Sequence, residues 1–501
     1  MKALNWKEML IGIVVILGSV WLLLYKIDAQ YMWTDEVYSF EAAQMVIKTG
    51  ETTLPTGMTY PRATFYHHLL ASSMKIFGEN EFGSRIINIP FILGTMILIY
   101  FILRKKNKLL GLSGSLLYLT TNFTIALVRE TRMYSVATFF LILTVFALYE
   151  GFINVKNGSK IKIGKLEYEV NIPWLMLTFI SFYLMYDTQP LTLLFGFGVI
   201  LFYFFKFILE QKKEDLLLVL SLTVLAILGI YFKYGTLNLI DLYFKLSPDW
   251  ANKYPPPIPY YSFILTINLP WCFLFAPISL FILSKYTKKL ELYLFSIFFS
   301  MLLILSLLQA QAERYIVSFI PLLIILTLFS LYEFYIYLKK IKPKLSKFFI
   351  PLVILIILIP QSIYLTKEMN EIDTYTKYSV AIYKKYEFND LEKYLSENLK
   401  DTDYLIADFH SVYTLYAMDF DIDYFLLPEE DQHWEWGERD TYFGIPLMNY
   451  ERDLVNFTEQ TKKEGGKIFV VLRDERLFDN IEEILGKDST FTNIPSLFII
   501  Q

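Results

Sequence analysis

Long runs of apolar residues dominate the first three quarters of the chain. Four lie in the first third, at residues 9–25, 86–103, 109–127 and 133–150. Each is close to the ~20 residues that an α-helix needs to cross a bilayer. Seven more follow, at residues 173–186, 190–208, 215–232, 260–283, 290–308, 315–338 and 348–366. We therefore predict a polytopic α-helical membrane protein with about eleven spans.

After residue 366 the pattern changes to that of a soluble α/β domain. An amphipathic helix over Asn389–Leu399 begins with a capping-box pair, Asn389 and Glu392. Further on, short apolar runs predict strands and amphipathic stretches predict helices: strands at Tyr404–Ala407, Lys467–Leu472 and Ser496–Ile500, and helices at Tyr450–Lys463 and Leu477–Leu485. Strands separated by helices predict a small, largely parallel sheet. Because no glycine-rich phosphate loop follows any strand, we interpret this domain as a binding or lid module.

Composition and charge agree with two domains. Hydrophobic residues make up 55% of the chain and charged residues only 19%, whereas soluble domains carry about 25% charged residues. Residues 367–501 hold 14 Lys+Arg and 29 Asp+Glu, a net charge of −15, which leaves +11 for residues 1–366. We predict a membrane domain over residues 1–366 and a soluble domain over residues 367–501. The single cysteine, Cys272, excludes an intrachain disulfide.

The basic residues predict the orientation, because Lys and Arg concentrate in cytoplasmic loops. They cluster in every second loop of the eleven-span arrangement, for example at residues 104–108, 156–165 and 339–347. The N-terminus is then cytoplasmic and the acidic domain lies outside, as does a long first loop over residues 26–85. Lys2 and Lys7 precede an apolar run without a small-residue cleavage site, so the first run reads as a retained span. The expected location is the plasma membrane.

Carboxylates and arginines gather at the predicted external ends of the spans, although charge is costly at membrane depth. They are Asp35, Glu36, Arg129, Glu130, Arg132 and Arg314. A carboxylate can act as general base toward a hydroxyl, and guanidiniums bind phosphate through paired hydrogen bonds. This combination suits displacement of a phosphate from a sugar carbon, with the phosphate belonging to a membrane lipid.

At this point the motifs resemble those of a known family. They are Trp33-Thr34-Asp35-Glu36, Tyr60-Pro61 followed by Tyr66, Gly78-Glu79-Asn80-Glu81-Phe82-Gly83-Ser84-Arg85, Arg129-Glu130-Thr131-Arg132-Met133-Tyr134, and Arg314-Tyr315. In this order the chain is similar to the GT-C glycosyltransferases, in the group with protein O-mannosyltransferases and aminoarabinose transferases. The motifs cover about a quarter of the chain, and the rest matches in layout.

The resemblance implies a metal-independent, inverting transfer of a monosaccharide from a polyprenyl-phosphate donor. Asp35 would deprotonate the acceptor hydroxyl, and Glu36 would orient or bind substrate beside it. The residues implied for the donor phosphate are Arg62, Arg129, Arg132 and Arg314, and those for the substrate pocket are Tyr66, Glu130, Tyr134 and Tyr315. No cofactor is required and no nucleic acid is involved. The acceptor is a glycan, a lipid or a protein, as in protein glycosylation or assembly of the cell envelope.

Two other functions stay open. One is an oligosaccharyltransferase-like enzyme with a lipid pyrophosphate donor and a divalent metal. The other is a transporter or flippase of lipid-linked sugars, although no inverted repeat is apparent. Structural roles are also alternatives to the catalytic and phosphate-binding ones. Asp35 could be a helix N-cap, and the arginines could be interfacial side chains. For His67 and His68 we expect interfacial packing, because adjacent helical residues point about 100° apart and rarely bind one metal ion.

Overall fold

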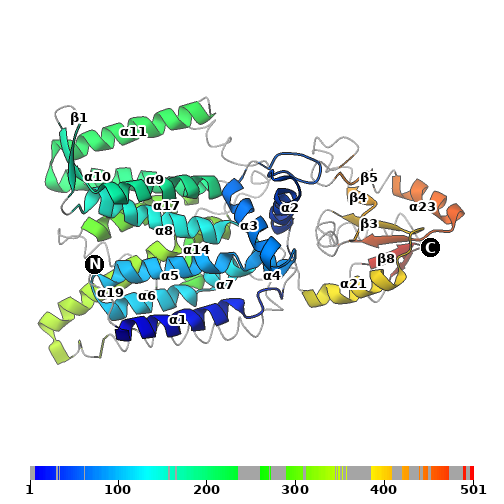
Figure 1. Ribbon diagram of the computed structural model, residues 1–501, viewed down its shortest axis with the longest axis horizontal. Coiled ribbons are helices and arrows are strands. Elements are labelled where there is room, and N and C mark those ends of the chain that lie inside the picture. The colour runs from blue at the N-terminus through cyan, green and yellow to red at the C-terminus, as the bar shows by residue number, and fades with distance from the viewer. Residues whose placement is uncertain are drawn as a thin grey trace. The chain divides into compact units, whose positions relative to one another are not determined.

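A computed structural model gives the fold (Figure 1). It describes residues 6–29, 32, 34–60, 62–155, 158–163, 166–234, 260–269, 271, 289–308, 312–344, 346, 348, 349, 353, 357, 385–408, 420–427, 439, 444–449, 453–472, 489–491 and 497–500. The chain divides into two compact units. The first comprises Met1–Leu23, Asn88–Val128 and Met133–Glu368, and the second comprises Leu24–Ile87, Arg129–Arg132 and Met369–Gln501.

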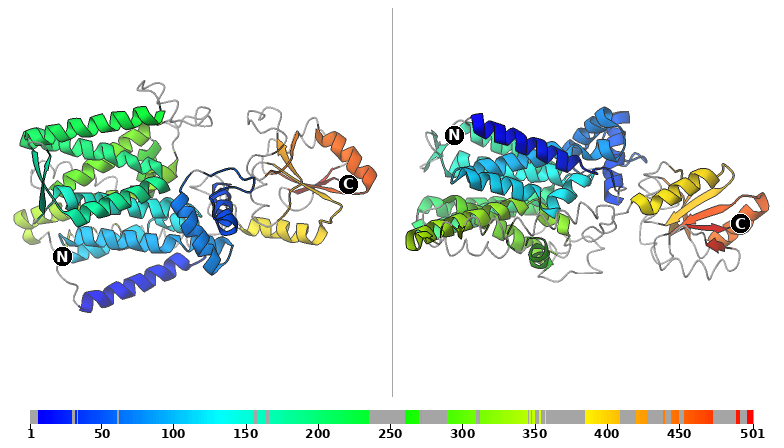
Figure 2. Two further views of the ribbon diagram at one scale, coloured as in Figure 1. Left: turned by 45° about the horizontal axis from the view of Figure 1, so that its top comes forward. Right: turned by 90° about the horizontal axis from the view of Figure 1, so that it is seen from below.

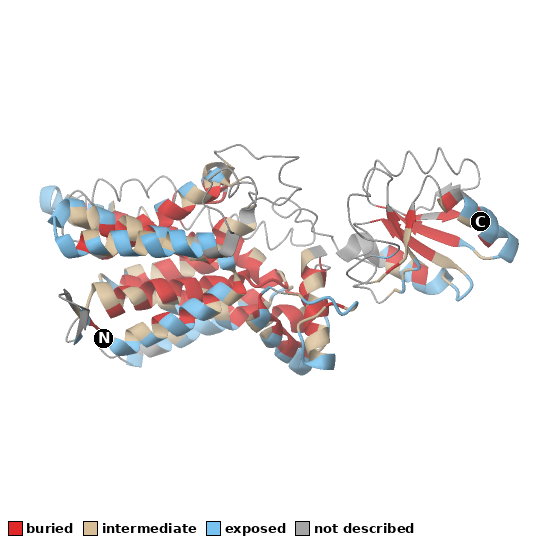
Figure 3. Cartoon of the chain, turned by 90° about the horizontal axis from the view of Figure 1, so that it is seen from above, coloured by how far each residue is buried: buried red, intermediate tan, exposed pale blue. Residues whose placement is uncertain are grey.

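The first unit is helical. Its helices follow the apolar runs: α1 (Trp6–Leu24), α5 (Asn88–Arg104), α6 (Lys108–Leu119), α7 (Asn122–Arg129), α8 (Tyr134–Leu148), α9 (Ile172–Thr188), α10 (Phe195–Glu210), α11 (Lys213–Tyr234), α14 (Tyr260–Asn268), α17 (Lys289–Leu307), α18 (Glu313–Val317) and α19 (Ile320–Ile341). A π-helical turn (Tyr149–Ile153) extends α8, and a 3-10 turn (Pro190–Leu194) precedes α10. Between α8 and α9 lies an antiparallel hairpin of β1 (Ser159–Ile163) and β2 (Leu166–Val170). The centre of this unit is α19, where every residue from Ile320 to Leu331 is buried. Figure 3 shows how burial is distributed over the chain.

The helices of this unit have the character of membrane spans. Among the described residues, five helical stretches are long and apolar enough to cross a bilayer: Glu81–Arg104, Tyr134–Ile153, Pro190–Glu210, Leu290–Leu307 and Arg314–Ile341. The pair α6 and α7 passes the same test jointly but is bent by 54°. The predicted membrane protein is therefore confirmed. The count of eleven spans is not, and most of the last predicted span, 348–366, lies outside the described residues.

The bend between α6 and α7 corrects the continuous span that we predicted over residues 109–127. It falls at Thr120 and Thr121, directly after α6. The hydroxyl groups of Thr121 and Thr124 both donate to the carbonyl oxygen of Tyr118, at 2.9 and 2.6 Å. Side chains that bond to nearby backbone carbonyls compete with the helix for these acceptors. The apolar pattern does not reveal this competition.

In the second unit, the predicted first loop is largely helical. It contains α2 (Thr34–Thr49), α3 (Thr64–Phe77) and α4 (Glu81–Arg85). Asp35 and Glu36 lie in the first turn of α2, where the partial positive charge of a helix N-terminus favours carboxylates. The N-terminus of α4 is capped by Asn80, whose side-chain oxygen accepts from the backbone N–H of Gly83 at 2.9 Å.

The C-terminal part of the second unit is a six-stranded sheet with helices on both faces (Figure 2). Its order is β5 (Leu447–Asn449), β4 (Tyr424–Leu427), β3 (Tyr404–Asp408), β6 (Ile468–Val471), β8 (Leu497–Ile500) and β7 (Ser489–Phe491). Helix α21 (Lys385–Asn398) packs on one face through Leu391 and Leu395, and α23 (Asp453–Glu464) packs on the other through Leu454.

The pairing differs in part from the expectation of a largely parallel sheet. The strands β5, β4, β3 and β6 are parallel, whereas β8 runs antiparallel to both β6 and β7. Helix α21 begins at Lys385, one turn before the predicted capping box. The helix predicted over Leu477–Leu485 lies outside the described residues.

Candidate active site

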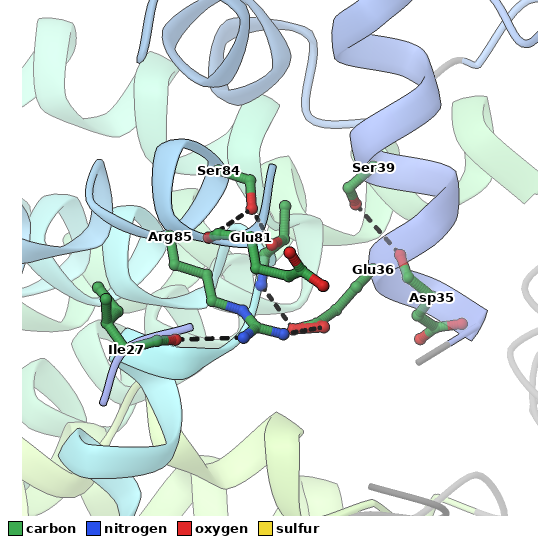
Figure 4. A network of polar contacts seen from close by, with 8 residues as sticks. Ile27, Asp35, Glu36, Ser39, Glu81, Ser84 and Arg85 are labelled. Atoms are coloured by element: carbon green, nitrogen blue, oxygen red, sulfur yellow. Dashed lines mark hydrogen bonds and ion pairs between the residues drawn. The ribbon is translucent and has the colours of Figure 1, made fainter. Parts of the chain in front are cut away.

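The charged residues of the first loop meet the Arg129–Arg132 segment inside the second unit. Figure 4 shows the part of this network around Glu36 and Arg85. The first turn of α2 contributes Asp35 and Glu36, α4 contributes Arg85, and the turn after α7 contributes Thr131 and Arg132. These residues come from three segments that are about 50 and 95 residues apart along the chain. The arrangement has two parts, one buried and one partly exposed.

The buried part is centred on Glu36. Its Oε2 atom lies 3.0 Å from Nη2 of Arg85, and both side chains are only 1% exposed. Its Oε1 atom accepts a hydrogen bond from the backbone N–H of Thr131 at 2.7 Å. The second terminal nitrogen of Arg85, Nη1, donates to the carbonyl oxygen of Ile27 at 3.1 Å. One carboxylate and one guanidinium thus connect four separate points of the backbone.

The partly exposed part is the pair of Asp35 and Arg132. The Nη2 atom of Arg132 lies 3.5 Å from Oδ2 of Asp35, and the aspartate side chain is 28% exposed against 8% for the arginine. The Nη1 atom of Arg132 donates to the backbone carbonyl of Asp35 at 2.6 Å and to Oγ of Ser39 at 3.1 Å. The guanidinium is therefore fixed at the start of α2, and the Asp35 carboxylate remains the more accessible partner.

The short helix α4 is held tightly beside this network. The hydroxyl of Ser73, on α3, donates to the carbonyl of Gly83 at 2.6 Å. The hydroxyls of Ser84 and Thr131 are 2.8 Å apart, and both side chains are fully buried. A Cβ atom on Gly83 would lie 1.9 Å from the carbonyl oxygen of Gly78. Glycine is therefore required at position 83 for α4 to approach α3 this closely.

Two polar side chains on the first turns of α3 are buried close to the same charges. The Tyr66 hydroxyl has no hydrogen-bond partner among the described residues, and the His67 ring is buried beside the backbone of Arg62 and Ala63. Burial lowers the pKa of His67 to about 3, and the charge of Arg132 acts in the same direction. Burial likewise raises the pKa of Tyr66 above its ordinary value. His67 is therefore a neutral, buried side chain, whereas we expected an interfacial one.

The structure places the other predicted site residues as follows. Within the second unit, Arg129 is buried and donates from Nη2 to the carbonyl of Tyr25 at 2.8 Å, Glu130 is half-buried and Arg62 is exposed. Tyr134, Arg314 and Tyr315 belong to the first unit. There Tyr134 is buried at the start of α8, and the Arg314 guanidinium lies 5.5 Å from the Tyr315 ring centroid. Trp33 lies outside the described residues.

Sequence reasoning missed Arg85, Ser39 and Thr131 as members of the site. Arg85 closes one of the motifs, but its position there did not indicate a buried partner 49 residues away. The N-cap role considered for Asp35 does not match the structure, because α2 begins at Thr34 and Asp35 is already inside the helix. In the part of the chain that the structure describes, no three His, Cys, Asp or Glu side chains are grouped so that they could hold a metal ion.

Part of the chain that contributes to this site matches a known family model. Residues 62–161, about a fifth of the chain, match the family model described as dolichyl-phosphate-mannose-protein mannosyltransferase. This range contains Arg85, Arg129 and Arg132, and it begins after Asp35 and Glu36. A search of curated proteins by sequence finds no match.

Solved membrane-enzyme structures share the fold. The crystal structure of ArnT from Cupriavidus metallidurans, in the apo state or bound to undecaprenyl phosphate, aligns with a TM-score of 0.61 and 11% identity over 97% of each chain. The archaeal oligosaccharyltransferase AglB from Archaeoglobus fulgidus, in complex with an inhibitory peptide and a dolichol-phosphate, aligns with a TM-score of 0.56 and 11% identity. That alignment covers 93% of this chain and 70% of AglB.

The predicted resemblance to the GT-C glycosyltransferases is confirmed by the family-model match and the shared fold. The chain is a membrane protein with the fold of that superfamily.

Proposed function

We propose that the chain is an integral membrane glycosyltransferase. It moves a monosaccharide from a polyprenyl-phosphate donor to an acceptor hydroxyl, with inversion at the anomeric carbon and with Asp35 as general base. The observation that carries the proposal is the arrangement of Asp35. Its carboxylate is partly exposed, lies 3.5 Å from Arg132, and stands beside a segment that matches a mannosyltransferase family model.

The proposed reaction is a single displacement. The acceptor oxygen attacks the anomeric carbon while Asp35 takes its proton, and the bond between that carbon and the phosphate oxygen breaks. The polyprenyl phosphate leaves with the electron pair of this bond. Positioned carboxylates are effective bases for such proton transfers, and arginines aimed at the leaving group stabilise its growing negative charge.

For the donor phosphate we propose Arg62, Arg129 and Arg132, which all belong to the second unit, and Arg314 of the first unit stays a prediction from the sequence. Arg132 is next to the proposed base, and Arg62 is exposed on the same unit. The similar structures of ArnT and AglB hold undecaprenyl phosphate and dolichol-phosphate, and both are ligands of the chemical class proposed here. Tyr66 and Glu130, which belong to the second unit, are proposed to line the substrate pocket, and Tyr134 and Tyr315 of the first unit stay predictions from the sequence.

The proposed site faces the outside of the plasma membrane, with the N-terminus in the cytoplasm and the sheet domain external. This orientation rests on the alternation of basic loops. No cofactor is needed for the displacement. The acceptor is a glycan, a lipid or a protein of the cell envelope.

Replacing Asp35 tests the proposal. With a polyprenyl-phosphate hexose as donor, Asp35→Asn should lower kcat by about 10²-fold or more, because a general base contributes about that much. Binding of the free polyprenyl phosphate should stay near the wild-type level. Glu51→Gln, an exposed acid on the same loop, is the matched control and should keep full turnover. Wild-type turnover in Asp35→Asn would contradict the assignment of the base.

The fold shared with AglB supports a second candidate, an oligosaccharyltransferase-like reaction with a pyrophosphate donor and a divalent metal. Two measurements on the purified, detergent-solubilised protein separate the candidates. Transfer that a chelator abolishes and Mn²⁺ or Mg²⁺ restores would favour this second reaction. Transfer that is unaffected by a chelator supports the first, and either form of transfer excludes a pure transporter.

A further inference from the structure

The carboxylate of Glu36 is directed into the protein interior and away from solvent. One oxygen accepts from Arg85 and the other accepts from the backbone N–H of Thr131, and the side chain is 1% exposed. A carboxylate bonded in this way is poorly placed to touch a substrate. We propose that Arg85 and Glu36 form a positioning pair that sets the distance between the Asp35 carboxylate and Arg132. This inference rests on the proposed function and gives Glu36 a different role from substrate contact.

Adjacency along the chain couples the Glu36 carboxylate to both Asp35 and Arg132. Glu36 follows the proposed base Asp35 directly, and Thr131 directly precedes Arg132. The 2.7 Å hydrogen bond from Thr131 to Glu36 therefore joins the immediate neighbours of Arg132 and Asp35, the partly exposed pair. A shift of the Glu36 carboxylate would move the backbone at Thr131, and Arg132 would move with it.

Arg85 keeps the Glu36 carboxylate in place. Its planar guanidinium donates from one terminal nitrogen to Glu36 and from the other to the carbonyl of Ile27 (Figure 4). Two donors in a rigid fork define a direction as well as a distance, which a lysine ammonium does not. Arg85 is itself fixed through α4, where Ser84 contacts Thr131 at 2.8 Å. The pair thus orders the loop before α2, the start of α2, α4 and the Thr131 turn relative to one another.

A purely stabilising role predicts something different. Apolar residues of similar volume commonly replace a buried ion pair without loss of stability, so stability alone does not require these two charges. If the pair only compensates charge in the interior, any variant that keeps one positive and one negative group should retain turnover. If the pair positions the site, a variant that keeps both charges but alters their reach should lose turnover.

The test uses two such charge-preserving variants. Arg85→Lys keeps the positive charge and loses the fork, and Glu36→Asp keeps the negative charge and draws the carboxylate back by one methylene. With a polyprenyl-phosphate hexose donor, we expect each to lower kcat by about 10²-fold, the usual effect of a misplacement of about 1 Å. The donor KM should change much less than kcat, since Arg132 is only one of the proposed donor ligands. Retention of kcat within threefold of wild type in both variants would overturn the proposal.

A second readout does not depend on activity. Hydrogen–deuterium exchange should become at least tenfold faster at residues 129–132 in both variants, because the Thr131 amide loses its acceptor geometry. Unchanged protection there would overturn the positioning pair whatever the activity. If the wild-type protein transfers no sugar from any polyprenyl-phosphate hexose while the variants do lose protection, the proposed function fails and the positioning pair stands.

A matched control comes from the first unit. Lys206 and Asp215 form another largely buried ion pair, with Nζ and Oδ1 2.6 Å apart. Asp215→Glu preserves the charges of this pair and changes its reach by one methylene, in the opposite direction to Glu36→Asp. It should leave both kcat and exchange at residues 129–132 at the wild-type level. A tenfold loss of kcat in this control would show that any disturbed ion pair impairs turnover, and this would overturn the specific role of Arg85 and Glu36.

Discussion

At the scale of single residues, His67 makes the stability of the second unit depend on pH. Burial holds its pKa near 3 in the folded chain, whereas an unfolded histidine titrates near 6.5. Between these values the unfolded state binds the extra proton, so stability falls as the pH is lowered through 6.5 and is restored above it. The difference amounts to about 2 kcal/mol between pH 7.5 and pH 5.

We therefore expect His67→Phe to flatten the dependence of unfolding free energy on pH in this range. Phenylalanine suits the site because the rings of Tyr60 and Tyr66 already pack edge-on against His67, with centroids 5.2 and 5.5 Å away. Denaturant unfolding in detergent at several pH values measures the effect. His68→Gln, at the exposed neighbouring position, should keep the wild-type slope. Parallel curves for wild type and His67→Phe would contradict the assigned pKa.

The same residues show how far a sequence can predict a site. Asp35 and Arg132 stood out because charge at the end of an apolar run is costly and therefore informative. The burial of Glu36, Arg85 and His67 could not be read in this way, because burial depends on which distant segment covers a side chain. Arg85 and Glu36 are 49 positions apart, and no local pattern reports such a pairing.

At the scale of elements, the close approach of α4 to α3 depends on Gly83. In Gly83→Ala the new Cβ would lie 1.9 Å from the carbonyl oxygen of Gly78, so α4 must move. We expect the free energy of unfolding to fall by about 2 kcal/mol, within the range of overpacked sites, and turnover to fall because Arg85 ends the same helix. Gly196→Ala on α10 meets no atom within 4 Å and should be neutral or slightly stabilising. Equal stability of the two variants would show that α4 tolerates the displacement.

Helices were predictable where the apolar period was long and regular. The run at residues 86–103 became α5 with a shift of one or two residues, and that at 190–208 became the 3-10 turn with α10. The pattern of apolar residues does not show where a side-chain hydroxyl will compete with the helix for a backbone carbonyl. For this reason the break at Thr121 was not predicted. It also did not predict α2, α3 and α4 as elements, because they lie inside a loop without long apolar runs, although we considered helices at Asp35 and at His67.

At the scale of the whole molecule, the partition of charge is the property that the sequence predicts most directly. The helical positions can all be right while the molecule is inverted in the membrane, because hydropathy has no direction. The direction comes only from the lysines and arginines. The acidic sheet domain, with a net charge of −15, would otherwise fit either side.

Cysteine labelling can decide the orientation, since Cys272 is the only cysteine to remove. In a Cys272→Ser background, Glu397→Cys places a thiol on the exposed face of α21, and Lys213→Cys places one at the exposed start of α11. A membrane-impermeant maleimide should label position 397 in intact cells and position 213 only after permeabilisation. Both cysteines should react fully once detergent dissolves the membrane, which controls for local access. The reverse order of labelling in intact cells would place the sheet domain in the cytoplasm. A polyprenyl-linked donor held on the outer face could then not reach Asp35. That result would overturn both the topology and the extracytoplasmic reaction.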